Sequence, residues 1–493
     1  MSDNDTTQTQ DGAAAPKWSA SKILIAVIIT ALVTFGMTAL LMNILERRSE
    51  QAQPAHNVVE LTRDTHDPAV WGQNYPRQYE SYKATSEMVA TTYAGATAVP
   101  QEPTEDDPRT EASSSRLEED PRLKVMWDGY PFSVDYTHAR GHEYMLVDQM
   151  YTQRVTDFNQ PGTCLNCHAS MPAVYDELGD GDMLAGFDAV NKLSYEEAAQ
   201  HASGPIACID CHNPETMELE ITRPAFINGI AALKAAEGID DYDVNRDATT
   251  QEMRSYVCAQ CHVEYYFDGD DGNKLTFPWS EGIHIDEIWE YYQKDGHIDF
   301  THATTGAEIV KAQHPEFDIW QNGVHADAGV SCADCHMSYD RAGAQKVTDH
   351  QINSPLLNIN QSCGTCHSDD VEVMEARVLT IQDRFVVSRN QAFDALVSLI
   401  YNIEEGIEAG IDEESLDLAR EYQNKASFYL DYVYSENSYG FHAPDYMQSI
   451  LMSSMDASRN GELALTGKTR EDLEPSDVTQ KYAEDMEQRS ANR

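Results

Sequence analysis

The sequence has few basic residues for its acidity. Against 83 Asp and Glu stand 34 Lys and Arg, so its 493 residues carry a formal net charge of −49. A chain of this charge repels phosphate backbones, and we therefore exclude nucleic acid as a partner. Many hydrated carboxylates suit either a saline environment, which we favour, or ordinary solubility.

Cysteine is absent outside one pattern. All ten cysteines belong to five Cys-x-x-Cys-His segments, which leaves none for a disulfide framework. The segments are Cys164, Cys167, His168; Cys208, Cys211, His212; Cys258, Cys261, His262; Cys332, Cys335, His336; and Cys363, Cys366, His367. Zinc ribbons and redox dithiols share the paired cysteines but need no histidine after each pair. The pattern instead predicts five covalently bound haem c groups, each with the histidine as an axial ligand of the iron.

Long hydrophobic runs are also scarce, and one at the N-terminus is long enough to span a bilayer. Residues 23–45 contain no charged side chain. We expect a retained membrane anchor rather than a cleaved signal, because no A-x-A-like cleavage site follows. Haem is attached outside the cytoplasm in c-type cytochromes generally, so this interpretation places the remainder on the periplasmic side of the membrane.

The rest of the chain separates into segments of different composition. The haem-binding region, residues 121–367, is rich in Gly, Pro, Asn and Asp, and residues 94–120 suggest an exposed insertion. Apolar residues then recur at helical spacing in residues 370–460, as the core of the chain or as a dimer seam. We predict a mainly α, multihaem cytochrome c fold with a haem-packed core, little β structure, long C-terminal helices and an N-terminal transmembrane helix. The predicted segments are a polar tail (1–22), an anchor (23–45), a linker (46–75), a pentahaem domain (76–464) and a charged tail (465–493).

Twelve histidines lie outside the five segments. They are His56, His66, His138, His142, His201, His284, His297, His302, His314, His325, His350 and His442. Some should be sixth ligands, because a haem bound by two histidines only transfers electrons, whereas a haem without a sixth ligand can bind substrate. Spacing alone does not say which.

Longer motifs resemble a known family. Cys258-Ala-Gln-Cys-His-Val-Glu-Tyr-Tyr-Phe267 is followed by Phe277-Pro-Trp279 and Lys311-Ala-Gln-His-Pro-Glu316. These segments, together with Gly129-Tyr-Pro-Phe-Ser133, Arg140-Gly-His142, Thr348-Asp-His350 and Gly440-Phe-His-Ala-Pro444, are similar to those of the pentahaem cytochrome c nitrite reductases that form ammonia. The resemblance covers roughly residues 80 to 460.

The resemblance implies a role for each matching position. It implies that the first haem, at Cys164 and Cys167, is open, with Arg154, Tyr265 and His314 in its pocket. It implies His350, His142, His442 and His325 as distal ligands of the second to fifth haems. One Ca²⁺ is implied beside the pocket, bound by the Glu264 carboxylate, the Tyr265 and Lys311 carbonyls and the Gln313 side chain. Many family members have lysine as the proximal ligand of the first haem, and this chain has His168.

The expected activity is six-electron reduction of nitrite to ammonium, with electrons from a quinol-oxidising membrane cytochrome c or another redox donor. We also expect a homodimer. A multihaem electron conduit with every iron closed is the competing class, although it would have no use for Arg154 and His314. The same pocket could also accept nitric oxide, hydroxylamine or sulfite.

Overall fold

The computed structural model describes residues 19–51, 57–87, 89–343 and 345–474. The chain divides into two units, which are residues 1–56 with 341–347, and residues 57–340 with 348–493. The predicted tails 1–22 and 465–493 fall largely outside the described residues, as does His56.

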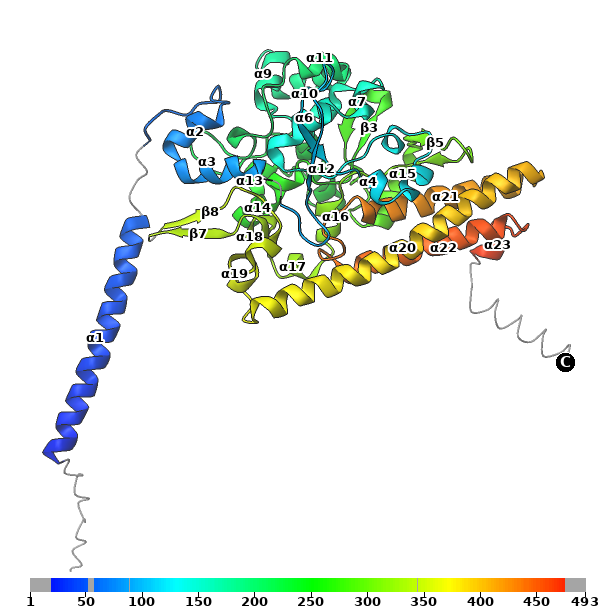
Figure 1. Ribbon diagram of the computed structural model, residues 1–493. Helices are drawn as coiled ribbons and strands as arrows, with labels where there is room; N and C mark the ends of the chain where they lie inside the picture. Colours follow the sequence, from blue (N-terminus) through cyan, green and yellow to red (C-terminus); the bar gives the residue numbers. More distant parts are fainter. Residues whose placement is uncertain (1–18, 52–56, 88, 344, 475–493) are drawn as a thin grey trace, which may run out of the picture. The chain divides into compact units, whose positions relative to one another are not determined.

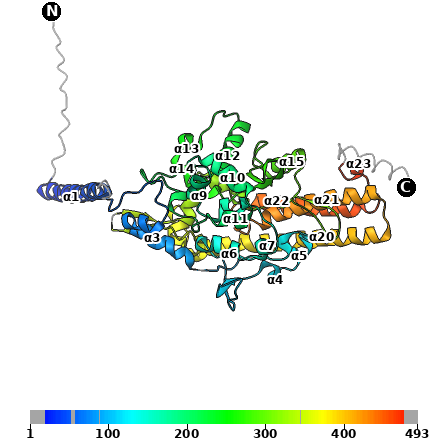
Figure 2. The same cartoon turned by 90° about the horizontal axis from the view of Figure 1, so that it is seen from above.

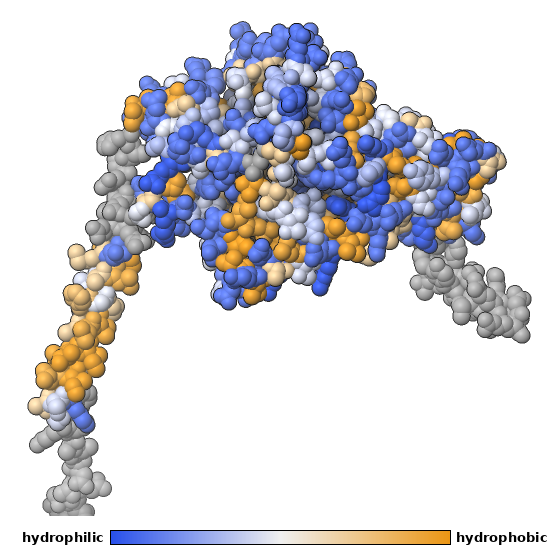
Figure 3. Space-filling model, viewed as in Figure 1, coloured by the Kyte–Doolittle hydropathy of each residue, from blue (hydrophilic) through white to orange (hydrophobic). Residues whose placement is uncertain are grey.

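The smaller unit contains helix α1 (Ala20–Gln51). Among the described residues, Ala20–Leu45 of this helix is the one stretch long and apolar enough to cross a membrane, and it includes the predicted anchor. Its large apolar side chains are exposed along the helix (Figure 3). A signal sequence has the same length and composition, so the helix is a candidate anchor.

Helices dominate the larger unit. The shorter ones are α2 (Pro68–Asn74), α3 (Pro76–Lys83), α4 (Arg116–Glu119), α5 (Arg122–Met126), α6 (Met145–Met150), α7 (Gln153–Thr156), α8 (Leu165–His168), α9 (Pro172–Leu178), α10 (Met183–Lys192), α11 (Tyr195–Ala199), α12 (Pro224–Ala236), α13 (Val244–Asp247), α14 (Thr250–Ala259), α15 (Ile285–Asp295), α16 (Glu316–Trp320), α17 (Val324–Asp327), α18 (Cys332–His336), α19 (Ile359–Ser362) and α23 (Arg470–Leu473). The three long ones are α20 (Val371–Ala409), α21 (Glu413–Tyr434) and α22 (Pro444–Ala464).

Strands are few and short in the described part of the chain. They form four two-stranded sheets, β1 (Ala98–Pro100) with β2 (Glu111–Ser113), β3 (Tyr266–Asp268) with β4 (Lys274–Thr276), β5 (Phe300–Thr301) with β6 (Glu308–Ile309), and β7 (Tyr339–Ala342) with β8 (Gln345–Thr348). The predicted mainly helical fold with little β structure and long C-terminal helices is confirmed.

The three long helices lie side by side (Figures 1 and 2). The turn between α20 and α21 is tight because Gly410 adopts a left-handed conformation, with φ of 74°. The Asp412 side chain then accepts a hydrogen bond from the Ser415 amide and caps α21. The sequence therefore folds this region as an antiparallel helical hairpin onto which α22 packs.

The apolar stripe of α20 is buried within the chain. Phe393, Leu396 and Ile403 are fully buried against neighbouring helices. At Gly461 in α22, a Cβ atom would lie 2.7 Å from the Leu399 side chain, so α22 needs glycine there to approach α20 closely. These residues of the stripe are therefore intrachain core, whereas Ile407, near the end of α20, is exposed.

Two segments expected to be irregular are partly folded. In the expected linker, Leu61 and Trp71 are buried and cluster with Ala207 and Ile209 beside the second Cys-x-x-Cys-His motif. Residues 94–120 contain the hairpin of β1 and β2 and the helix α4. Both segments carry scattered rather than periodic apolar residues, so periodicity did not reveal them.

Candidate haem sites and active site

Each Cys-x-x-Cys-His motif forms a helical turn. The backbone amide of the histidine donates to the carbonyl of the first cysteine at 3.0 Å in His212, 3.1 Å in His262 and 2.9 Å in His367. The other two motifs end the helices α8 and α18. One turn thus brings two sulfurs and an imidazole to one face, as attachment of one haem requires.

Four of the five motif histidines face another imidazole ring. The ring centroids are 6.3 Å apart for His212 and His350, and 6.4 Å for His262 and His142. They are 6.2 Å apart for His336 and His442, and 6.4 Å for His367 and His325. These are the pairs that the resemblance implied for the second to fifth haems.

The spacing of these rings fits a shared metal ion. Metal–imidazole bonds are about 2 Å long, so two imidazoles that bind opposite sides of one metal have centroids about 6 Å apart. The partner histidines come from distant parts of the chain. For example, His442 lies in the loop before α22, and His142 lies shortly before α6. Four haem sites with histidine on both sides therefore suit the residues present.

The first motif lacks such a partner. In the described part of the chain, no imidazole or aromatic ring faces His168 at a comparable distance. On its other side, its Nδ1 lies 2.9 Å from the Met145 carbonyl oxygen, which fixes the imidazole tautomer. His168 would therefore hold a haem without a second imidazole, which suits an iron that binds substrate.

Arg154 lies beside this motif without a carboxylate partner. No Asp or Glu among the described residues comes within the 4.0 Å of an ion pair with its guanidinium, which lies 4.2 Å from the Phe132 ring centre. Burial raises the pKa of the Cys164 thiol to about 12, and the nearby Arg154 charge opposes that rise. An unpaired cation in so acidic a chain is suited to binding an anion.

Tyr265 and His314 are half-buried near the same motif. Burial raises the pKa of Tyr265 well above its usual value, and the neighbouring Cys167 and Cys164 thiols reinforce the rise. Burial lowers the pKa of His314 to about 4; Glu316 opposes this, and His262 and His168 add to it. The structure therefore brings a phenol and an imidazole to the first motif together with Arg154.

The residues implied as calcium ligands also lie together. Glu264 is fully buried, and its carboxylate accepts hydrogen bonds from the Gln313 backbone amide at 2.7 Å and from Tyr292 at 2.9 Å. The Gln313 side-chain amide reaches the Lys311 carbonyl at 3.2 Å. Carboxylate, carbonyl and amide oxygens are the donors that Ca²⁺ prefers.

Two buried carboxyl groups at this position would be stabilised in their charged form by a nearby cation. Burial raises the pKa of Glu264 well above its usual value and that of the adjacent Asp318 to about 7. The Lys311 amine lies 3.2 Å from Asp431, and no basic group in the described chain forms an ion pair with Glu264. The described residues hold no cluster of three His, Cys, Asp or Glu suited to a metal, so a cation here would depend on carbonyl and amide oxygens as well.

Most remaining histidines have other partners. His138 lies 2.8 Å from Glu119, His201 lies 3.0 Å from Glu177, and His302 reaches the Val125 carbonyl at 2.9 Å. His284 caps α15, and His297 packs on Tyr266. These histidines belong to the local packing of the protein.

Sequence reasoning missed the groups that orient the imidazoles. Glu436 lies 2.6 Å from Nδ1 of His442, and Glu316 lies 3.7 Å from Nδ1 of His262. These two glutamates cannot be told apart by spacing from the rest of the 83 acidic residues. The Met145 carbonyl belongs to the backbone, so no residue type in the sequence indicates it.

Comparison with known proteins agrees with this geometry. The family model of cytochrome c552 matches residues 67–492. A cytochrome c-552 of Bacteroides fragilis is 34% identical over 443 residues, covering 88% of this chain and 84% of that protein. The cytochrome c nitrite reductase subunit NrfA of Nitratidesulfovibrio vulgaris is 33% identical, covering 81% of this chain and 78% of that protein.

A solved structure has the same fold. The catalytic subunit of cytochrome c nitrite reductase from Desulfovibrio desulfuricans superimposes with a TM-score of 0.72 at 30% identity, covering 84% of this chain and 88% of that one. That structure is described as having two calcium sites. On the family match and these similarities, the chain belongs to the cytochrome c552 family.

Proposed function

We propose that this protein reduces nitrite to ammonium at the haem bound by Cys164, Cys167 and His168. The observation that carries the proposal is a contrast within the described residues: four motif histidines face a second imidazole, and His168 faces none. The relatives named as nitrite reductases support the substrate. The four paired sites, at the second to fifth haems, would relay electrons to the first haem.

The reaction consumes six electrons and eight protons for each nitrite and releases ammonium and two water molecules. Bound haem would supply the iron and the electrons. Arg154 would bind the anion and hold it as oxygen leaves, since no carboxylate among the described residues forms an ion pair with its guanidinium. His314 and Tyr265 would donate hydrogen bonds to the bound anion and pass protons to it.

We further propose one Ca²⁺ at Glu264, Tyr265, Lys311 and Gln313. Glu264 supports it, because it is buried and no basic group in the described chain forms an ion pair with it, and the ion would add positive potential near Arg154. The candidate anchor Ala20–Leu45 supports a place at the periplasmic side of the membrane, where a quinol-oxidising cytochrome or another donor would supply electrons. A homodimer is part of the same proposal.

An anaerobic assay tests the proposal. Purified protein with five haems is mixed with a reduced one-electron dye and nitrite, and both oxidised dye and ammonium are measured. Six dye molecules oxidised for each ammonium formed is the expected result. If nitrite caused no additional oxidation of the dye by protein with five intact haems, the proposal would be overturned and an electron conduit would be favoured. Parallel assays with hydroxylamine, nitric oxide and sulfite show which substrate has the highest kcat/KM.

A further inference from the structure

We infer that Arg109 and Arg140 are positioning residues for the first haem, because through Asp148 they hold the short helix whose Met145 carbonyl orients His168. The inference rests on the proposed function only in taking that haem as the reacting one. Nothing in the resemblance or in the comparisons assigns a role to Arg109 or Asp148.

The chain of contacts begins at the imidazole. Nδ1–H of His168 donates to the Met145 carbonyl at 2.9 Å. Such a hydrogen bond fixes the ring and makes the imidazole a stronger electron donor to a bound metal. The acceptor lies at the first residue of α6, a helix of six residues. A helix this short is not stable by itself, so its position depends on outside contacts.

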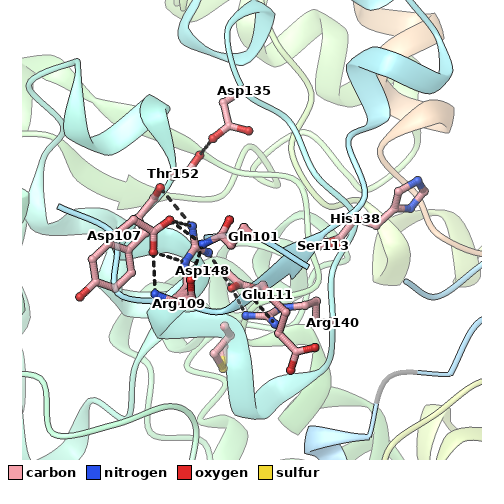
Figure 4. A network of polar contacts seen from close by, with 12 residues as sticks. Gln101, Asp107, Arg109, Glu111, Ser113, Asp135, His138, Arg140, Asp148 and Thr152 are labelled. Carbon is pink, nitrogen blue, oxygen red and sulfur yellow. Dashed lines mark hydrogen bonds and ion pairs between the residues drawn. The ribbon is translucent and has the colours of Figure 1, made fainter. Parts of the chain in front are cut away.

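Asp148 provides those contacts one turn further along α6. Arg140, whose side chain is 2% exposed, donates to both carboxylate oxygens of Asp148, with its Nε at 2.7 Å. Arg109 donates to the same carboxylate from the other side, with its Nη1 at 3.0 Å. Figure 4 shows both guanidinium groups directed at Asp148. Bidentate charged pairs of this kind fix geometry strongly.

Arg109 also contacts Tyr151, which lies shortly before Arg154 in the chain. Arg109 Nη2 lies 3.4 Å from the Tyr151 carbonyl, and its guanidinium lies 5.2 Å from the Tyr151 ring centre. Asp107 neutralises the second positive charge by accepting two hydrogen bonds from Arg109, at 2.9 and 2.7 Å. Two arginines and two aspartates therefore form a cluster of zero net formal charge behind the first haem motif, in which Arg140 is buried and the other three are half-buried.

Arg109 comes from the segment expected to be an exposed insertion. The antiparallel pairing of β1 with β2 closes the hairpin, and Gln101 donates to both the Arg109 carbonyl and Asp107 at 3.0 Å. The hairpin thus positions the Arg109 guanidinium next to Asp148 of α6. Residues 94–120 would therefore support the first haem site, a role that their composition does not indicate.

The test uses two variants of the full protein. Asp148→Asn removes the charge that both arginines share, and Arg109→Met is milder because Arg140 still holds Asp148. Arg459→Met is the matched control, since Arg459 forms an exposed pair with Asp456, at 61% exposure of each side chain. The haem content of each variant shows whether it has assembled correctly. A redox titration, followed by electron paramagnetic resonance, measures the midpoint potential of each haem. The His168→Lys variant identifies the first haem.

Both variants should shift the midpoint potential of that one haem upward, because a weaker Nδ1–H hydrogen bond lowers electron donation by His168. kcat/KM for nitrite should fall about tenfold, as is usual when a metal ligand loses its support. Arg459→Met should change neither. Wild-type potentials in both variants with five haems would overturn the inference. If wild-type protein failed to reduce nitrite and the potential still moved, the proposed function alone would fail.

Discussion

The first haem motif and the other four share one sequence pattern but differ in what lies opposite the histidine. His212, His262, His336 and His367 each face a second imidazole at 6.2 to 6.4 Å between ring centres. His168 faces none among the described residues, and the unpaired Arg154 lies nearby. Under the proposed function, the motif would fix where haem is attached, and distant segments would decide whether a site can bind substrate.

The largest expected effect comes from removing the cation at the first site. Arg154→Gln should lower kcat/KM for nitrite by about 10²- to 10³-fold, the usual cost of losing one preorganised electrostatic group. The five haems should remain, since no hydrogen bond joins Arg154 to a motif histidine in the part of the chain that the structure describes. Steady-state kinetics with haem quantification measures this. The control is Arg122→Gln, in which an arginine with carboxylate partners is removed; equal losses in the two variants would contradict a specific role.

A second variant makes a closed site resemble the first. His142→Ala removes the ring that faces His262. The count of high-spin haems should rise from one to two, and nitrite turnover should fall on the order of tenfold because the relay is disturbed. Electron paramagnetic resonance counts the spin states. His138→Ala, at a histidine that pairs with Glu119, should leave the count at one; an unchanged count in His142→Ala would disprove the pairing.

Calcium removal should have a smaller effect at the first site. Chelation, or Glu264→Gln, should lower nitrite turnover several-fold, because positive potential beside Arg154 is lost. Added Ca²⁺ should restore the chelated wild-type protein but not the variant. Metal analysis should find one Ca²⁺ fewer in Glu264→Gln than in the wild type. Full activity in protein shown to be free of calcium would contradict this site.

The smallest effect concerns acid stability of the cluster behind the first motif. Hydrogen bonds from Arg109 lower the pKa of Asp107 to about 2 from 3.8. Because the folded-state pKa is the lower one, this stabilisation is complete above about pH 4 and is lost as pH falls to 2. The melting temperatures of wild type and Asp107→Asn should thus differ at pH 5 and converge near pH 2. A constant difference would contradict the shift, and Asp456→Asn serves as an exposed control.

The sequence predicted the elements that follow from spacing. The five motifs, the apolar run at 23–45 and the stripe containing Phe393 and Leu396 are all visible as patterns. Helix α22 was not predicted as a separate element, because small residues such as Ser454 and Gly461 form much of its buried face. Close packing of small side chains gives little hydrophobic periodicity.

The site was predictable only in part, for a related reason. The pairing of motif and distant histidines followed from the family resemblance, not from spacing. The groups behind them, such as the Met145 carbonyl and Asp148, act through tertiary contacts between distant segments. Backbone acceptors and abundant carboxylates leave no signature in a single sequence, and the fold alone brings them together.

Counting haem spin states in the oxidised wild-type protein tests the central claim most directly. The account predicts one high-spin haem that changes on addition of nitrite and four low-spin haems that do not. Five low-spin haems, with no change on adding nitrite, would contradict it.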